Sequence, residues 1–137
     1  RHVTTVMDVH LMIAPVDPYI DAFADAWEQQ PLFASQSRLT PAVVAGQRRR
    51  RLAQRADGLA ANLACFGLAE MPDTWPALRR WSGRLTWMAG ALDHKFVAIA
   101  ERVGRERPAT RVIIVQDAGH NLLLEAPEAV IAAALGV

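Results

Sequence analysis

Two short apolar runs in the second half of the sequence limit the fold most strongly, because each is followed by a residue with acid–base chemistry. The first run covers 84–89 and leads to Asp93, and the second covers 111–115 and leads to His120. Nearly continuous apolar runs of this length are typical of parallel strands that are buried on both faces. Residues 94–105, between them, carry apolar side chains at helical spacing, as a crossover helix requires. The pattern predicts an α/β fold in which a helix connects two parallel strands.

Asp93 and His120 are the candidate catalytic residues. Catalytic groups of open parallel sheets gather beyond the carboxyl ends of the strands, where both residues are expected. In a Ser-His-Asp triad the histidine is the base and the aspartate fixes its tautomer. Taken alone, Asp93 is better explained as the N-cap of the following helix, and His120 as a solvated loop residue. Their positions after consecutive strands favour the catalytic pair.

The third member of such a triad is missing from its usual setting. No Gly-x-Ser-x-Gly phrase, the turn that presents the nucleophile of an α/β-hydrolase, occurs in the 137 residues. An acid and then a histidine after successive strands is the order of the last two triad members in that fold. Because the first residue is Arg1 rather than methionine, we expect an N-terminal portion to be missing. The expected fold class is α/β, the C-terminal part of an α/β-hydrolase with its last parallel strands and flanking helices, plus a helical lid.

Three parts can be separated along the chain. Residues 1–17 are expected to be a strand and linker, since 2–13 alternate between apolar and polar side chains. Residues 18–81 read as helical and are expected to form the lid region, inserted between strands. Residues 82–137 are expected to be the C-terminal strand–helix–strand–helix part of the hydrolase core. We expect helices over 18–29, about 41–55, 59–66, 75–81 and 125–135, with Gly58 as the break between the second and the third. Residues 31–41 are expected to be a loop.

The composition excludes several classes of protein. The formal net charge is +1, so no global field favours nucleic acid or a membrane surface. No apolar run approaches the ~20 residues of a membrane span, and no signal peptide is visible. His2, His10 and His94 have no second ligand at metal spacing, so we expect no metal site. We also expect no cofactor. The single cysteine, Cys65, lies on an apolar helical stretch and is expected to be a buried small hydrophobe.

A basic run precedes Arg55, a candidate substrate-binding residue. Residues 48–51 are all arginine and are expected to form a solvated helix face, because a nucleic-acid site would need a broader basic patch with stacking aromatics. Arg55 follows four residues after Arg51. Arginine is well suited to clamp a substrate carboxylate, which points to an anionic small-molecule substrate. A solvated charge is the alternative explanation.

Six phrases together carry a family resemblance. They are Trp-Glu-Gln-Gln-Pro-Leu-Phe-Ala-Ser at 27–35, Leu-Ala-Gln-Arg at 52–55, Ala-Asn-Leu-Ala at 61–64, Gly-Ala-Leu-Asp-His-Lys-Phe at 90–96, Ala-Gly-His-Asn at 118–121 and Glu-Ala-Pro at 125–127. The first two are fairly specific, and the Gly-His-Asn phrase is shared by many hydrolases. From about residue 21 to its end, the chain resembles the menaquinone-pathway α/β-hydrolases, the 2-succinyl-6-hydroxy-2,4-cyclohexadiene-1-carboxylate synthases.

The resemblance implies a cytoplasmic carbon–oxygen lyase that eliminates pyruvate after proton abstraction, with a serine–histidine pair acting as the base. Asp93 and His120 match the family's triad acid and base. Trp27 and Arg55 match its substrate-contacting tryptophan and arginine, although a core aromatic on a helix face remains the alternative for Trp27. Without the serine, the chain alone is expected to be inactive.

Two other functions stay open. One is an α/β-hydrolase that cleaves an ester or a C–C bond. The other is a non-catalytic remnant that associates with a partner. In either case two or three strands leave an apolar sheet edge exposed, so we expect self-association or pairing with the missing N-terminal half.

Overall fold

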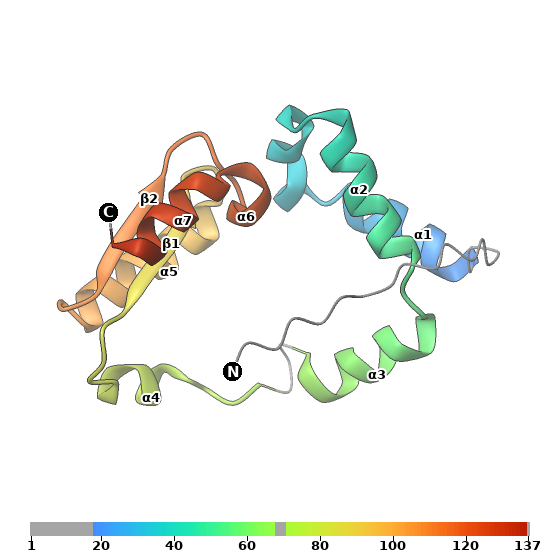
Figure 1. Ribbon diagram of the computed structural model, residues 1–137. Helices are drawn as coiled ribbons and strands as arrows, with labels where there is room; N and C mark the ends of the chain where they lie inside the picture. The colour runs from blue at the N-terminus through green and yellow to red at the C-terminus, as the bar shows by residue number, and fades with distance from the viewer. Residues whose placement is uncertain (1–17, 68–70, 137) are drawn as a thin grey trace, which may run out of the picture.

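The computed structural model describes residues 18–67 and 71–136. The strand expected over 2–13 lies outside these ranges. Figure 1 shows the helices α1 to α3 side by side with the part of the chain that contains the strands. The candidate site lies where these two groups touch.

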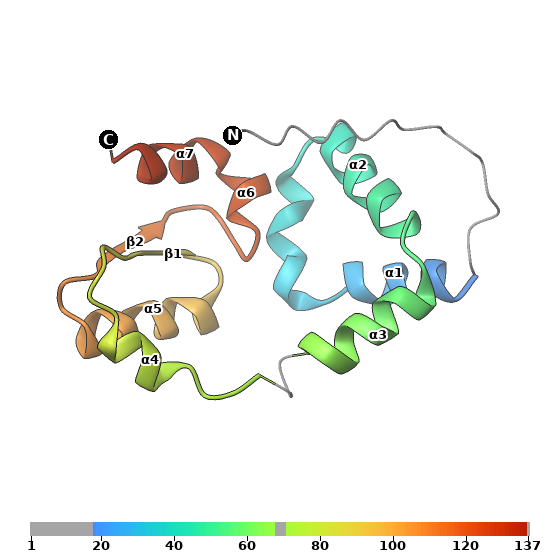
Figure 2. The same ribbon diagram turned by 60° about the horizontal axis from the view of Figure 1, so that its bottom comes forward.

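A parallel pair of strands forms the centre of the C-terminal part, as predicted. Strand β1 (Thr86–Gly90) pairs with β2 (Arg111–Val115), with Thr86 opposite Arg111 and Gly90 opposite Val115. Helix α5 (His94–Glu106) connects them and covers one face of the pair, and α7 (Pro127–Leu135) lies on the other face (Figure 2). The buried apolar residues of this part are Ala89, Ala100, Val103 and Ala118.

The last helix begins later than predicted. Instead of one helix over 125–135, a short helix α6 (Leu122–Glu125) precedes α7, and Ala126 between them has φ −149° and ψ 57°. Pro127 explains the break, because a proline disfavours helical backbone in the residue before it and is well suited to the first turn of a new helix. The separate α6 places Glu125 beside the loop that carries His120.

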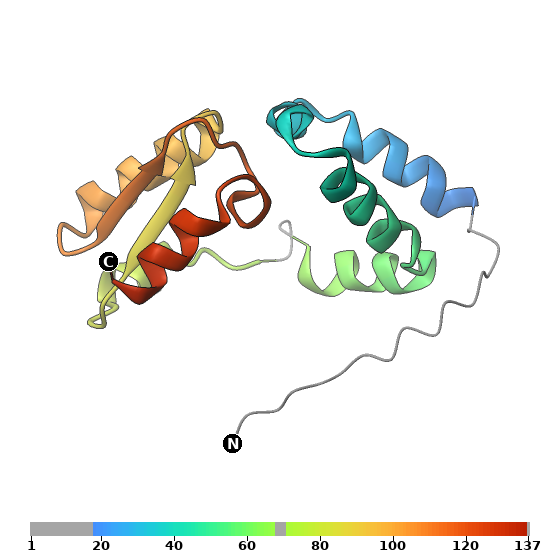
Figure 3. The same cartoon turned by 45° about the horizontal axis from the view of Figure 1, so that its top comes forward.

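The N-terminal helices differ from the sequence expectation in two places. The loop expected over 31–41 is mostly a 3-10 helix, η1 (Pro31–Arg38). The predicted break at Gly58 is wrong: the chain leaves the helix at 53–55, where Arg55 has extended backbone, and Gly58 lies inside the next helix. The helices in this region are α1 (Pro18–Glu28), α2 (Pro41–Leu52), α3 (Ala56–Phe66) and α4 (Trp75–Arg80). Figure 3 shows α1, α2 and α3 following one another at the same end of the molecule.

Ion pairs join α1 to α2. Arg48 lies 2.7 Å from Asp21, 2.7 Å from Asp25 and 2.9 Å from Glu28. The hydrogen bond with Asp25, followed by that with Glu28, raises the pKa of Arg48. Arg51 also pairs with Glu28, at 2.8 Å. The solvated face expected for 48–51 is therefore wrong for Arg48 and Arg51, which hold two helices together.

Helix α3 buries none of its residues. Cys65 is exposed, so the expectation of a buried hydrophobe is wrong. Leu63 and Phe66 on the same helix are 60% and 73% exposed. Across the described residues, no helix has both the length and the apolar character needed to cross a membrane.

Candidate active site

Asp93 and His120 meet at the carboxyl ends of the two strands. Nδ1 of His120 lies 2.7 Å from Oδ2 of Asp93. Because a carboxylate only accepts hydrogen bonds, Nδ1 carries a proton and Nε2 remains as the acceptor of the neutral ring. The Asp93 side chain is 3% exposed and that of His120 is 32% exposed. A buried acid thus orients an imidazole whose other nitrogen is available to act as a base.

Asp93 also caps α5. Its Oδ1 accepts a hydrogen bond from the backbone N–H of Phe96 at 3.1 Å. The two explanations considered for Asp93, a helix cap and a partner of histidine, therefore describe the same side chain, with one oxygen used for each.

Glu125 holds the peptide groups on both sides of His120. Its Oε2 accepts from the N–H of Gly119 at 2.7 Å, and its Oε1 accepts from the N–H of Asn121 at 3.1 Å. From the sequence, Glu125 is expected only as part of a family phrase and as the start of the last helix. The local signal that could have found it is a carboxylate five residues after the histidine, on the turn that follows.

The ends of the two strands approach each other so closely that Gly90 has no room for a side chain. A Cβ on Gly90 would overlap the carbonyl oxygens of Ala118 and Gly119. Beyond Gly90, the N–H of Leu92 donates to the carbonyl of Ala118 at 3.0 Å. This close approach brings Asp93 to the loop that carries His120.

Two phenylalanine rings contact the imidazole of His120 edge-on. The ring centroid of Phe96 lies 5.0 Å from that of His120, with an interplanar angle of 69°, and Phe33 lies at 5.9 Å and 68°. Phe96 comes from α5 and Phe33 from η1, so both groups of helices contribute to the site. In the sequence, Phe33 stands out only as part of the first family phrase.

Trp27 lies one ring further from the histidine. Its centroid is 5.6 Å from Phe33, and it is also stacked on Phe23 at 5.6 Å. Trp27 is 44% exposed, so it is not a core aromatic. Its described ring contacts are with Phe23 and Phe33, not with His120. It extends the aromatic row away from the imidazole toward solvent.

Arg55 has a carboxylate partner of its own. Its Nε and Nη2 donate to Oδ1 and Oδ2 of Asp57 at 3.1 Å and 2.7 Å. This hydrogen-bonded pair raises the pKa of Arg55 and lowers the pKa of Asp57. Among the described contacts, the arginine nearest the aromatic row is Arg51, 6.0 Å from the ring centre of Phe33.

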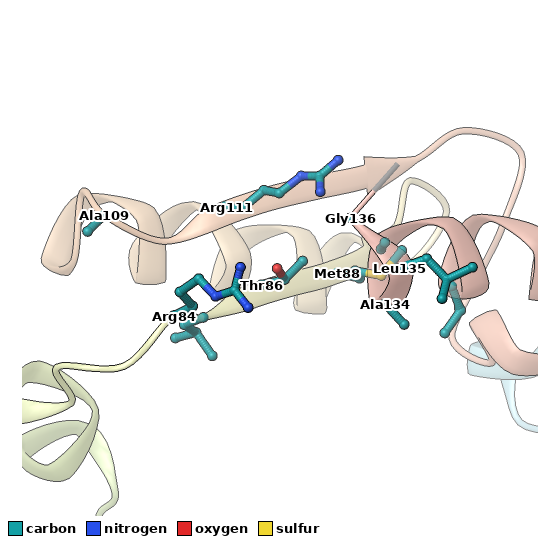
Figure 4. Close-up of a pocket in the computed structure, with 11 residues that line it drawn as sticks. Arg84, Thr86, Met88, Ala109, Arg111, Ala134, Leu135 and Gly136 are labelled. Carbon is teal, nitrogen blue, oxygen red and sulfur yellow. The ribbon is translucent and has the colours of Figure 1, made fainter.

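Asp93 and His120 line none of four cavities found among the described residues. One, of about 600 Å³, lies between β1, the start of β2 and α7, and Arg84, Met88 and Leu135 are among its lining residues (Figure 4). Another, of about 400 Å³, is a groove between α2 and α6 that reaches Asn121. Within the described part of the chain, no group of three or more histidine, cysteine or acidic side chains could hold a metal ion.

Comparisons with known proteins point to one group of enzymes. No protein-family model matches the chain. It is 34% identical over 79% of its length to a Bacillus subtilis (strain 168) protein provisionally named 2-succinyl-6-hydroxy-2,4-cyclohexadiene-1-carboxylate synthase, and 34% identical over 84% of its length to the synthase of that name from Salmonella heidelberg. The structure of MenH from S. aureus matches 85% of the chain with a TM-score of 0.81 and 31% identity.

The match covers only part of each relative. The chain spans 39% and 42% of the two curated relatives and 44% of the solved MenH chain.

Proposed function

We propose that this chain, which has the fold of the C-terminal part of an α/β-hydrolase and resembles the 2-succinyl-6-hydroxy-2,4-cyclohexadiene-1-carboxylate synthases, supplies the acid and base of a pyruvate-eliminating lyase. The 2.7 Å contact between Asp93 and His120 carries the proposal. It leaves one imidazole nitrogen as a base at the end of the sheet, where catalytic groups of this architecture lie.

The proposed reaction is a proton abstraction followed by elimination. Nε2 of His120 accepts the proton through the hydroxyl of the triad serine, which another portion of the enzyme supplies. The electron pair left on the substrate carbon forms a new ring double bond, and the carbon–oxygen bond breaks with its pair on the departing enolate of pyruvate. That enolate takes up a proton at its methylene carbon to become pyruvate, and the imidazolium gives up its proton to restore the base. Asp93 stabilises the imidazolium while the proton is held there.

Trp27 and Arg55 are the proposed substrate-binding residues. An exposed arginine that already holds a carboxylate in bidentate geometry can exchange Asp57 for a carboxylate of an anionic substrate. Trp27 is 44% exposed and lies in the aromatic row that leads to His120. In this proposal α1 to α3, with η1, form the lid over the site.

The proposal also covers location and partners. We place the enzyme in the cytoplasm. In the described residues β1 pairs with β2 alone, and we assign its open edge to the portion that carries the serine, or to a second copy of this chain.

The decisive experiment is a chimera that carries this chain in place of the matched portion of the Bacillus subtilis relative. Pyruvate release is measured for the chimera, for its His120→Ala variant and for the chain alone. We expect release from the chimera only. Equal rates for the chimera and its His120→Ala variant would end the assignment, and turnover of a simple aryl ester without pyruvate release would favour a hydrolase.

A further inference from the structure

Helix η1 touches the loop that carries His120 at more than the Phe33 ring. A Cβ built on Gly119 would overlap the hydroxyl of Ser35 and lie 2.9 Å from the Cβ of Ser35. Ser35 therefore occupies the space that a side chain on Gly119 would need. Ser35 lies two residues from Phe33, whose ring contacts the imidazole.

The hydroxyl of Ser35 contributes no hydrogen bond to this contact. Its oxygen is buried and has no partner within the described structure. An unpaired buried hydroxyl costs free energy, so it does not hold η1 in place. The same burial keeps it from acting as the missing nucleophile. What Ser35 provides at this point is a side chain small enough to fit against Gly119.

A second link between the two segments is weak. Arg38 lies 3.9 Å from Asp117, but their side chains are 59% and 94% exposed. Exposed ion pairs at such a distance stabilise little. The close contacts between η1 and the loop are therefore that of Ser35 with Gly119 and that of Phe33 with His120.

We propose that Ser35 is a positioning residue: its fit against Gly119 sets the distance between η1 and the His120 loop and thereby seats Phe33 on the imidazole. Together with Phe96, Phe33 then packs edge-on against the ring and restricts its orientation. The geometric part of this proposal concerns the chain alone. Its consequence for turnover rests on the proposed function.

The first test is NMR of the imidazole signal of His120 in the chain itself. Phe33 and Phe96 both lie close enough to shift this signal by their ring currents. Ser35→Leu should remove the Phe33 contribution and keep that of Phe96, whereas Ser35→Ala should leave the signal in place. Ser37→Leu is the matched control, because Ser37 lies on the same helix with an exposed side chain. An unchanged signal in a folded Ser35→Leu protein overturns the proposal.

The second test is a steric rescue, which holds even if Ser35→Leu does not fold. Gly119→Ala should displace the signal of His120, and adding Ser35→Gly should restore it. The competing neighbour is Oε2 of Glu125, 3.1 Å from the Cβ that the alanine would introduce. If Ser35→Gly fails to restore the signal, the methyl group is opposed by Glu125 and Ser35 does not set the distance.

The activity test uses the chimera described above. A displacement of about 1 Å at a catalytic group can cost about 100-fold in rate, so Ser35→Leu should lower kcat by about 10-fold or more, and Ser35→Ala by less than about 2-fold. If the unaltered chimera releases no pyruvate, the proposed function fails while the NMR result stands. If the chimera is active and Ser35→Leu keeps its kcat, the positioning role is excluded.

Discussion

Oε2 of Glu125 accepts a hydrogen bond from the backbone N–H of Gly119 at 2.7 Å. With its other oxygen on Asn121, the carboxylate fixes the backbone on both sides of a proposed catalytic histidine without touching the imidazole. Charged acceptors bound to backbone donors make hydrogen bonds stronger than neutral pairs. A residue outside the triad therefore holds the loop backbone from which the base projects.

Replacing Glu125 by alanine should destabilise the chain by about 2 kcal/mol, because two backbone donors lose a charged acceptor. Glu125→Gln should retain part of this stability, since its amide oxygen can still accept one of the bonds. Urea unfolding measures the difference. Glu128→Ala is the matched control, because Glu128 is an exposed acid in the first turn of α7. Equal stability of Glu125→Ala and Glu128→Ala would show that the two hydrogen bonds do not hold the loop.

Asp93→Asn should separate the two uses of Asp93. Asparagine still caps a helix, so we expect the stability of the chain to change by less than about 1 kcal/mol. In the active chimera, kcat should fall by about 10⁴-fold, because an amide can donate to Nδ1 and favour the wrong tautomer. Thermal unfolding and pyruvate release are measured on the same preparations. A loss of kcat below about 10-fold would remove Asp93 from the mechanism.

Arg55→Ala should raise KM in the chimera with little change in kcat, if the arginine holds a substrate carboxylate equally in the ground and transition states. Asp57→Ala should act in the opposite direction, lowering KM, because it frees the guanidinium from its present partner. Arg49→Ala, on the exposed face of α2, is the control for the loss of a positive charge. If Arg49→Ala and Arg55→Ala raise KM alike, the effect is one of net charge, and Arg55 is not a specific clamp.

Glu106 should make stability depend on pH in the acidic range. Hydrogen bonds from Arg79 at 2.6 Å and Arg102 at 2.7 Å lower the pKa of Glu106 below its ordinary value of 4.5. The folded state then binds fewer protons than the unfolded state, so the stabilisation is complete above the unfolded pKa and is lost as pH falls through the folded pKa. Glu106→Gln should destabilise the chain at neutral pH and match the parent in strong acid. A stability difference that persists unchanged into strong acid would contradict this role.

The chain alone should associate with itself at high concentration. In the described residues β1 has one strand partner, and an open strand edge is a template for pairing. Light scattering over a concentration series tests this, and adding the serine-bearing portion of the Bacillus subtilis relative should compete with self-association. A monodisperse monomer at every concentration would show that the edge is protected.

The elements that carry the site could be predicted because their signals are local. Continuous apolar runs predicted both strands, and the rule for the ends of parallel strands predicted that Asp93 and His120 would lie together. Glu125 was missed because its partners are backbone N–H groups, so only its position five residues after the histidine marks it in the sequence. The pairing of Arg48 with acids of α1 escaped for a different reason: it depends on how two helices meet, across 20 or more positions of the chain. Exposure of Cys65 could not be read from periodicity, which finds an apolar face but does not say what covers it.

Asp93 caps a helix and also binds the imidazole, and this determines which residues would change first in the sequence if the activity were lost. One carboxylate oxygen starts α5 and the other meets the imidazole, so selection for folding alone would still retain an aspartate or asparagine there. The described side-chain hydrogen bond of His120 goes to Asp93 and not to a backbone group, so this side chain does not start a helix or fix a turn. In a decaying descendant the histidine would therefore be replaced first, and among related sequences the residue at 120 is a better sign of retained chemistry than the acid at 93.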